Sequence, residues 1–305
     1  MDTVMLIFWQ ILKMFLLAGL GALLYRGKLI TREGSKALGN ILIYLALPAV
    51  IINSFLVDRT PERLREMLFS AGMAAGLLLV SILISRLFFR KDPIAAFAGA
   101  FSNPGFFGVP LIVASAGQSS VFYVAFFIAF LNILQWTYGV SILNGQPVRQ
   151  GLTAGKLIRA PFIIAILVGL LLFLTRIQLP EVISGCLTTV ASLNTPLAML
   201  TVGIYLAQSD LKQMIRKKSL YFVAAIRLLL IPAVSILLLS LLPQSMYEMK
   251  MALLIVAACP VGSNVAVYAQ LYGKDYPYAV ETVVLSTVLS LASIPLIMYL
   301  SSLIR

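Results

Sequence analysis

The stretch SNPGFFGVP, residues 102–110, interrupts an apolar segment that covers residues 93–117. A second stretch, CPVGSN at residues 259–264, interrupts the apolar segment 248–273 in the same way. A proline lies near the middle of each segment, with a glycine close by. Proline removes a backbone donor and clashes with the preceding turn, and glycine weakens a helix further. We therefore expect both segments to be helices that open in their middle.

The rest of the chain is too apolar for a water-soluble fold. Hydrophobic residues make up 61% of its 305 positions and charged residues 11%, whereas a soluble chain is about half apolar and one-quarter charged. A helix that crosses a bilayer needs roughly 20 residues. Barrel strands would alternate apolar and polar residues, which these segments do not do. We predict an all-α membrane protein whose ten transmembrane helices cover residues 4–25, 36–57, 66–89, 93–117, 119–143, 159–175, 181–208, 219–242, 248–273 and 277–302.

The composition also excludes several classes of partner and cofactor. The net charge of +12 fits the basic cytoplasmic loops of membrane proteins, so we expect membrane lipid and no nucleic acid as partner. The chain has no histidine, and its two cysteines, Cys186 and Cys259, both fall in apolar segments. We therefore expect no metal site, no disulfide and no cofactor. The N-terminus lacks the basic region of a cleaved signal peptide, so the first apolar segment is expected to remain.

The basic residues predict how the helices are oriented, because Lys and Arg concentrate in cytoplasmic connections. The connections between helices 1–2, 3–4, 5–6, 7–8 and 9–10 carry fifteen of these basic residues, and the opposite face of the membrane carries six. We therefore expect the first set of connections in the cytoplasm and both termini on the extracytoplasmic side of the plasma membrane. The fifteen are Arg26, Lys28, Arg32, Lys36, Arg86, Arg90, Lys91, Arg149, Lys156, Arg159, Lys212, Arg216, Lys217, Lys218 and Lys274; the six are Arg59, Arg63, Arg65, Arg176, Lys250 and Arg305.

The ten segments divide into two halves of five, residues 1–146 and 147–305, at the longest polar connection. An odd number of helices per half inverts one half relative to the other, an arrangement that recurs in secondary transporters. Prolines occur at matching places in the two halves, since Pro48 and Pro196 each lie in the second helix of their half. The half-helix after each break presents free N–H groups and the positive end of its dipole. Two such ends meeting at mid-depth would form an anion site.

The interrupted stretches resemble those of the auxin efflux carrier family, which includes bacterial malonate and malate permeases and the plant auxin carriers. The run NPGFFGVPL at 103–111 resembles the helix-4 signature of that family. CPVGSN at 259–264, followed by YAQLYG at 268–273, resembles its helix-9 partner, and LPA at 47–49 fits helix 2. The short connection between helices 5 and 6 departs from plant carriers that have a long cytoplasmic loop there.

This resemblance implies the fold of the bile-acid symporters and sodium/proton antiporters, with helices 4 and 9 crossing at their breaks. Helices 1, 2, 6 and 7 would form a scaffold that mediates homodimerisation. Helices 3–5 and 8–10 would form a transport unit that moves in an elevator-like way. The substrate would be a small organic anion, such as a dicarboxylate or an auxin-like acid.

Polar side chains near the breaks are the candidate substrate ligands. Asn132 and Gln135 are three residues apart on helix 5 and share one face, and an amide offers donors to a carboxylate. The predicted substrate-binding residues are Asn103, Pro104, Gly105, Asn132, Gln135, Pro260, Gly262, Ser263 and Asn264. No catalytic residue is predicted.

Three ionisable side chains lie within predicted spans, where they are costly and usually face the bundle interior. Lys13 is interpreted either as charge compensation for the substrate or as an interior partner of backbone carbonyls. Arg227 and Glu281 are expected to pair with each other; alternatively, Arg227 would bind the anion or Glu281 would carry a proton.

The leading hypothesis is therefore a secondary carrier of small carboxylates. A sodium-coupled symporter or a cation/proton antiporter of the same fold is the alternative, although no acidic residue lies near either break. An enzyme is not expected, because the sequence offers no histidine, no acidic pair at depth and no metal-ligand cluster. An ion channel fits the broken helices less well than alternating access does.

Overall fold

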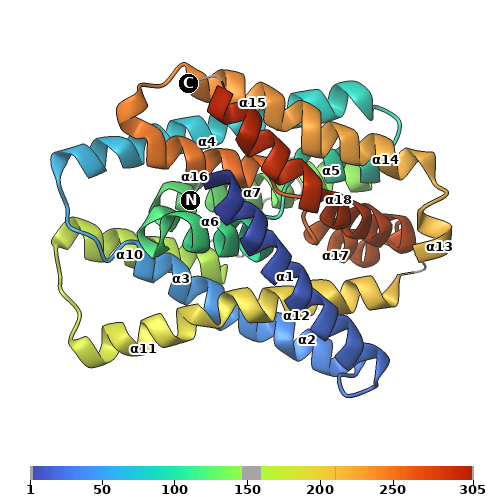
Figure 1. Cartoon of the computed structure of the whole chain (residues 1–305), viewed down its shortest axis with the longest axis horizontal. Helices are drawn as coiled ribbons and strands as arrows, with labels where there is room; N and C mark the ends of the chain where they lie inside the picture. The colour runs from blue at the N-terminus through green and yellow to red at the C-terminus, as the bar shows by residue number, and fades with distance from the viewer. Residues whose placement is uncertain (1–2, 146–158, 210, 304–305) are drawn as a thin grey trace.

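The computed structural model describes residues 3–145, 159–209 and 211–303, and within these ranges every regular element is a helix. The first half contains α1 (Thr3–Arg26), α2 (Arg32–Ile41), η1 (Leu42–Ala46), α3 (Leu47–Ser54), α4 (Pro61–Phe88), α5 (Pro93–Ala100), η2 (Pro104–Gly108), α6 (Val109–Ala116), η3 (Gln118–Val124), α7 (Ala125–Leu134), η4 (Gln135–Gly139) and α8 (Val140–Asn144). Figure 1 shows their arrangement.

The second half contains α10 (Pro161–Thr175), α11 (Glu181–Ser192), α12 (Asn194–Gln208), α13 (Leu211–Met214), α14 (Lys218–Ala225), η6 (Ile226–Leu230), α15 (Ile231–Ser240), η7 (Gln244–Met246), α16 (Tyr247–Ala258), α17 (Asn264–Leu271) and α18 (Tyr276–Leu303). The predicted division of the chain near residue 146, and the basic residues Arg149 and Lys156, lie outside the described residues.

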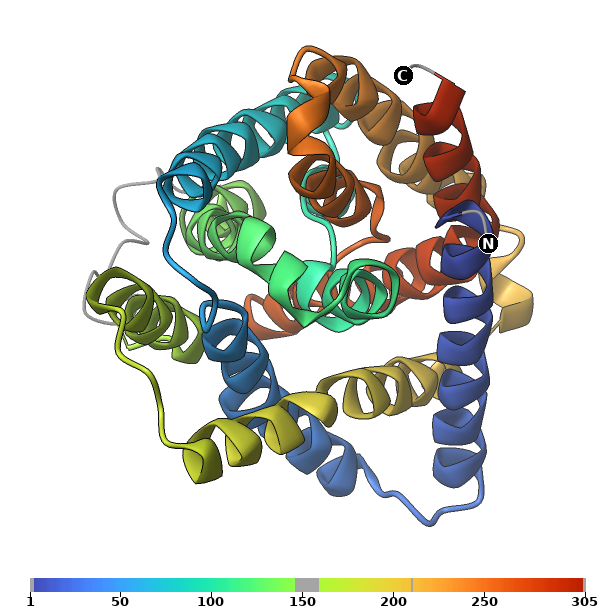
Figure 2. The same cartoon turned by 60° about the vertical axis from the view of Figure 1, so that its left-hand side comes forward.

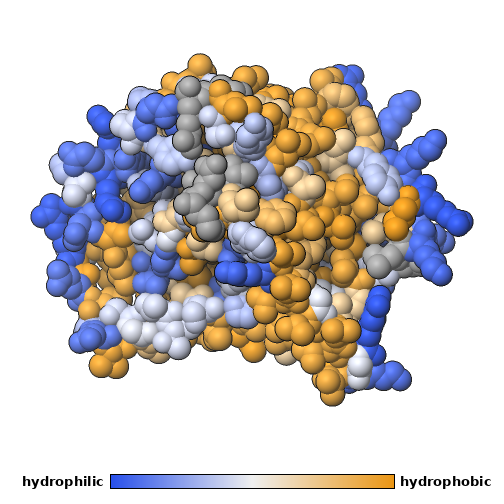
Figure 3. Space-filling model, viewed as in Figure 1, coloured by the Kyte–Doolittle hydropathy of each residue, from blue (hydrophilic) through white to orange (hydrophobic). Residues whose placement is uncertain are grey.

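The chain is an all-helical membrane protein. In the described residues, seven helices are long and apolar enough to cross a bilayer: Met5–Arg26, Glu33–Ser54, Pro61–Phe88, Gln118–Asn144, Glu181–Gln208, Lys218–Ser240 and Tyr276–Leu303. Two shorter apolar helices are Pro104–Ala116 and Pro161–Thr175. The surface agrees with a membrane environment, because hydrophilic residues gather at the left and right ends of Figure 3 and apolar residues fill the band between them.

The two predicted interruptions are present. The first apolar segment stops being helical after α5 and resumes at η2, and the second stops after α16 and resumes at α17. These breaks lie among helices that form two groups. In Figure 2, α1 (dark blue), α11 and α12 (yellow) lie below and to the right of the central green helices, whereas α4 (cyan), α14 and α15 (orange) lie above them. The central position places both breaks inside the protein, where irregular backbone can be tolerated.

Prolines shape the helices in a way that the sequence analysis did not predict. Three π-helical turns in the described chain each end two residues before a proline: η1 before Pro48, η2 before Pro110 and η6 before Pro232. A proline has no N–H to donate and its ring clashes with the carbonyl four residues earlier. The preceding turn widens to accommodate the ring, and a widened turn changes the direction of the side chains it carries.

Helices α1 and α12 pack with their backbones in close contact. The contact is possible because Gly203 on α12 faces Ala18 on α1, while Gly21 on α1 faces Leu200 on α12. Small residues at such positions allow membrane helices to approach closely and gain dispersion energy. This packing fixes α12 against α1 on the side of the molecule opposite to α4 and α15.

Candidate functional site

The two broken segments cross each other and are joined by backbone hydrogen bonds. The Asn103 N–H donates to the Pro260 carbonyl and the Gly262 N–H donates to the Phe101 carbonyl, both at 2.9 Å. Ser102 and Val261 form the antiparallel bridge between them. The crossing is therefore a two-residue piece of antiparallel sheet inside a helical protein, and it satisfies backbone groups that the broken helices leave free.

Glycine is required at position 262 because no side chain fits at the crossing, and not because glycine weakens a helix. A Cβ atom at this position would lie 2.7 Å from the Ser102 carbonyl oxygen and 3.3 Å from the Phe101 carbonyl oxygen. Only glycine allows the two chains to approach this closely. The Val261 N–H is held from a third helix, because it donates to the Ser286 hydroxyl of α18 at 3.0 Å.

Asn103 begins the half-helix that follows the first break. Its side-chain Oδ1 accepts a hydrogen bond from the Phe106 N–H at 3.2 Å, and its carbonyl accepts from the Phe107 and Gly108 N–H groups at 3.2 Å. This is an N-cap, which satisfies one of the free donors at the start of a helix. With the cap acceptor used in this way, the Asn103 amide NH₂ is the part of the side chain available to a ligand.

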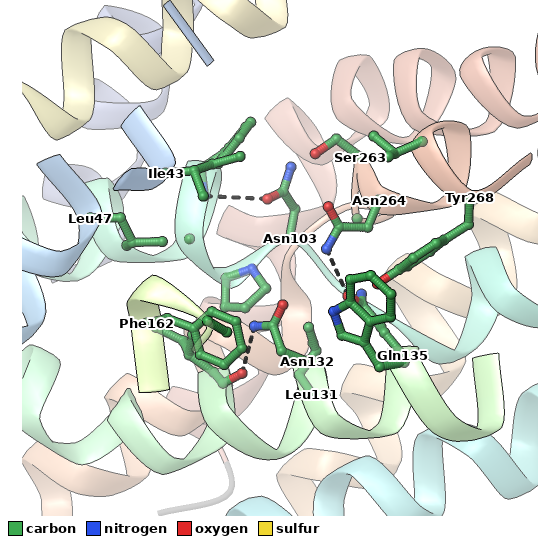
Figure 4. Close-up of a pocket in the computed structure, with 18 of the residues that line it drawn as sticks. Ile43, Leu47, Asn103, Leu131, Asn132, Gln135, Phe162, Ser263, Asn264 and Tyr268 are labelled. Atoms are coloured by element: carbon green, nitrogen blue, oxygen red, sulfur yellow. Dashed lines mark hydrogen bonds between the residues drawn. The ribbon is translucent and has the colours of Figure 1, made fainter. Parts of the chain in front are cut away.

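A pocket of about 660 Å³ opens beside the crossing. Its walls come from both broken segments, from α7 and η4, and from the helices α3 and α10. Apart from Arg159 and the aromatic residues, the polar lining residues are Ser102, Asn103, Asn132, Gln135, Thr137, Ser263 and Asn264. Figure 4 shows the side chains of Asn103, Asn132, Gln135 and Asn264 gathered around one space. The volume falls in the range of small-molecule sites.

Gln135 is the best-placed amide in this pocket. Its side chain is fully buried, and its Oε1 accepts a hydrogen bond of 2.7 Å from Asn264 Nδ2. Its Nε2 has no partner in the described structure, nor does the hydroxyl of Ser102. A buried donor without a partner costs free energy that a ligand can recover. The acceptor of Gln135 is thus occupied, and its donor is left for a ligand.

Asn132 and the apolar walls complete the pocket. Asn132 Nδ2 donates to the Ile128 carbonyl at 2.7 Å, so its Oδ1 is directed away from its own helix. Trp136 and Tyr268 stack edge to face, with ring centroids 5.4 Å apart. Leu47 and Phe162 lie on the opposite side of the pocket, and Leu131 lines it beside Asn132 (Figure 4). The pocket therefore combines a polar end with apolar walls.

The structure brings eight of the nine predicted substrate-binding residues to this pocket: Asn103, Pro104, Gly105, Asn132, Gln135, Gly262, Ser263 and Asn264. Pro260 does not line it and contributes its carbonyl to the crossing instead. Arg159, which is exposed, is the one charged residue among the described residues that line the pocket. None of these lining residues is acidic.

The expected ion pair between Arg227 and Glu281 is wrong. Glu281 pairs with Lys217, whose Nζ lies 2.6 Å from Oε2, and Arg227 is bonded to carbonyls near the crossing. Depth explains the difference. Lys217 directly precedes α14 and pairs with the second turn of α18, whereas Arg227 is about 15 Å further along its helix, at 1.5 Å per residue. Neither Arg227 nor Glu281 lines the pocket.

Lys13 is not in the pocket either. It lies in the middle of α1 on an exposed face, between the buried residues Ile11 and Met14. The prediction of an interior side chain at this position is therefore wrong. The sequence of α1 has no hydrophobic periodicity that would identify which face points outward, because nearly all of its residues are apolar.

The comparison with known proteins decides the family. The family model described as "Membrane transport protein" matches residues 6–298, nearly the whole chain. The chain belongs to this family. The resemblance to the auxin efflux carriers drawn from residues 103–111 is confirmed, and this family member is a multi-pass membrane transporter rather than an enzyme. A protein of Rhizobium meliloti (strain 1021), named "Putative malonate transporter", is 27% identical over 283 residues, which cover 88% of this chain and 87% of that relative.

Three residues that line this family member's candidate site were not among the predicted site residues. Ser102, next to the predicted Asn103, brings an unpaired buried hydroxyl to the pocket. Trp136 and Tyr268 form an aromatic wall. The adjacency of Ser102 to the break could have indicated its role, whereas the pairing of the aromatics depends on how α17 and η4 pack.

Proposed function

We propose that this chain is a secondary carrier of small organic anions, and that it binds the substrate carboxylate in the pocket beside the crossing. The observation that carries the proposal is the unpaired Nε2 donor of Gln135, buried in a polar pocket without an acidic residue among its described lining. Two half-helices begin at this pocket, at Pro104 and Asn264. Their positive ends favour a negatively charged ligand.

Small carboxylates are the substrate class that fits the pocket best. An amide NH₂ donor and a hydroxyl can each bind one carboxylate oxygen, and charge-assisted bonds of this kind are stronger than neutral ones. The name of the Rhizobium meliloti relative supports a dicarboxylate such as malonate. A cation/proton antiporter is disfavoured, because such relays use acidic residues or histidine and the described lining offers neither.

The proposed architecture has ten membrane-crossing segments, as two inverted repeats over residues 1–146 and 147–305. Helices 1, 2, 6 and 7 of this count would form a scaffold and homodimer interface, and helices 3–5 and 8–10 an elevator-like transport unit. The connections around residues 29 and 215 lie at one end of the molecule, and those around residues 58 and 178 lie at the other end (Figure 1). This placement supports segments that cross the membrane in alternating directions. The charge bias of the connections supports extracytoplasmic termini in the plasma membrane.

Replacing Asn103 by alanine tests whether this residue belongs to the site. The substitution removes the amide from the pocket and the N-cap from η2. We expect the initial rate of labelled malonate uptake into proteoliposomes to fall at least about tenfold, because the amide NH₂ that would donate to the substrate carboxylate is lost. The cap accounts for about 1 kcal/mol of the stability.

Thr60→Ala is the matched control. Thr60 also caps a helix, with its hydroxyl accepting from the Arg63 N–H at the same 3.2 Å, but it does not line the pocket. It should cost similar stability and leave malonate uptake within about twofold, since a lost cap weakens folding by only about 1 kcal/mol. Normal uptake by the Asn103 variant would remove Asn103 from the site, and equal losses in both variants would assign the effect to stability.

A further inference from the structure

Among the described residues, Arg227 is the largest fully buried side chain, with 1% of its surface exposed. Its guanidinium donates to the Ser81 hydroxyl at 3.0 Å, to the Gly99 carbonyl at 3.2 Å and to the Ala100 carbonyl at 3.5 Å. The other terminal nitrogen donates to the Ala257 carbonyl. A buried arginine is costly unless it compensates something specific, so its acceptors indicate its role.

The carbonyl acceptors of Arg227 are the ends of the two half-helices that run into the crossing. Gly99 and Ala100 are the last two residues of α5, and Ala257 is the last but one of α16. The final carbonyls of a helix have no intrahelical partner and carry the negative end of its dipole. One guanidinium therefore binds both negative helix ends, behind the residues that form the crossing.

No carboxylate balances this arginine within residues 3–145, 159–209 and 211–303, because the ion pair found there joins Lys217 to Glu281. The charge of Arg227 is opposed only by neutral groups, namely the carbonyl dipoles and the Ser81 hydroxyl. Ser81 itself donates to the Ala100 carbonyl at 2.8 Å, so it supports the same helix end.

The balance of partial charges at the crossing shows what Arg227 adds. A helix end carries roughly half an elementary charge, positive at the N-terminus and negative at the C-terminus. Two C-terminal ends and two N-terminal ends meet here, and together they sum to about zero. Arg227 cancels the two negative ends, which leaves the two positive ends at Pro104 and Asn264 unopposed.

We propose that Arg227 is the positioning residue that gives this otherwise neutral pocket its preference for anions. It joins the ends of α5 and α16 and supplies a fixed positive charge behind the pocket wall, without touching the substrate. Arg159, the charged residue of the described lining, is exposed, so its charge is screened by water and salt. The inference rests on the proposed transport of organic anions.

Three variants in proteoliposomes test this role. We expect Arg227→Gln to raise the KM for dianionic malonate at least about tenfold, because a unit positive charge is lost from a low-dielectric region behind the pocket. The KM for the monoanionic half-amide, malonamate, should rise less, since that ligand carries one negative charge fewer. Arg227→Lys keeps the charge and should keep the ratio of the two KM values near that of the wild type. Arg86→Gln, the same change at an exposed arginine at the end of α4, should alter neither KM.

The ratio of the two KM values separates electrostatics from folding, because a merely structural defect raises both values alike. An unchanged ratio in a folded Arg227→Gln protein would overturn the inference. If that variant fails to fold, Arg227→Lys decides: a preserved ratio supports the inference and a lost preference for the dianion overturns it. A wild-type protein that transports neither compound would instead refute the proposed function.

Discussion

Replacing Gln135 by glutamate is expected to abolish carboxylate transport while the protein stays folded. The substitution has almost the same shape and keeps an oxygen to accept from Asn264 Nδ2. It replaces the unpaired Nε2 donor by an oxygen and introduces a negative charge into the pocket. Two like charges 4 Å apart repel by about 4 kcal/mol at an effective dielectric constant of 20. We therefore expect the KM for malonate at pH 7.5 to rise at least about a hundredfold.

Two further variants make this experiment decisive. Gln135→Leu removes the donor without adding a charge and should raise KM by only about tenfold, the cost of one lost hydrogen bond to a charged group. Gln208→Glu makes the same chemical change at an exposed position at the end of α12, away from the pocket, and should transport normally. Transport by Gln135→Glu at the wild-type KM would show that the substrate binds elsewhere.

Gly203→Ala is expected to have the largest effect on stability. A Cβ atom at this position would overlap the Ala18 carbonyl oxygen, and it would lie 2.7 Å from the carbonyl carbon and 2.9 Å from the Ala22 nitrogen. These are backbone atoms of α1, so the two helices must move apart to make room. Overpacking of this kind costs about 3 kcal/mol. In detergent, the midpoint of thermal unfolding should fall by at least about 5 °C.

Gly19→Ala provides the control on the same helix pair. Gly19 lies on α1, and a Cβ atom there would meet nothing within 4 Å. Alanine is also the better helix former, so this variant should be neutral or more stable by up to about 1 kcal/mol. Equal unfolding midpoints for Gly203→Ala and the wild type would contradict the close packing of α1 against α12.

Much of the helix pattern and most of the candidate site were predictable from the sequence because proline and glycine act locally. Their effect on a helix depends on the backbone of the same segment, so the two breaks followed from the residues at 102–110 and 259–264 alone. Asn103 and Asn264 lie directly at those breaks, and both line the pocket. The spacing of Asn132 and Gln135 placed these two residues on one helix face.

The partners of the charged residues were not predictable in this way. Pairing depends on which helices lie side by side and at what depth, and segments that are apolar all round give no signal for either. Arg227 was therefore assigned to Glu281, although its guanidinium binds the carbonyls of Gly99 and Ala257. The acceptors are backbone groups, which any residue provides, so no side chain at those positions identifies them.

The crossing itself shows the same limit. Two breaks can be read from two segments separately, but the antiparallel bridge between Ser102 and Val261 is a contact between them. Glycine at position 262 is compatible with a weak helix as well as with a close approach, and only the arrangement of both chains distinguishes the two. Residues that meet through such contacts, such as Trp136 and Tyr268, were missed for this reason.

The central claim is that small organic anions pass through the pocket beside the crossing, and counterflow of labelled malonate tests it most directly. Proteoliposomes loaded with unlabelled malonate should take up the label in a saturable way, and those with Gln135→Glu should not. Empty liposomes and Gln208→Glu serve as controls. Uptake of monovalent cations without uptake of any carboxylate, or equal malonate counterflow by the wild type and Gln135→Glu, would contradict the account.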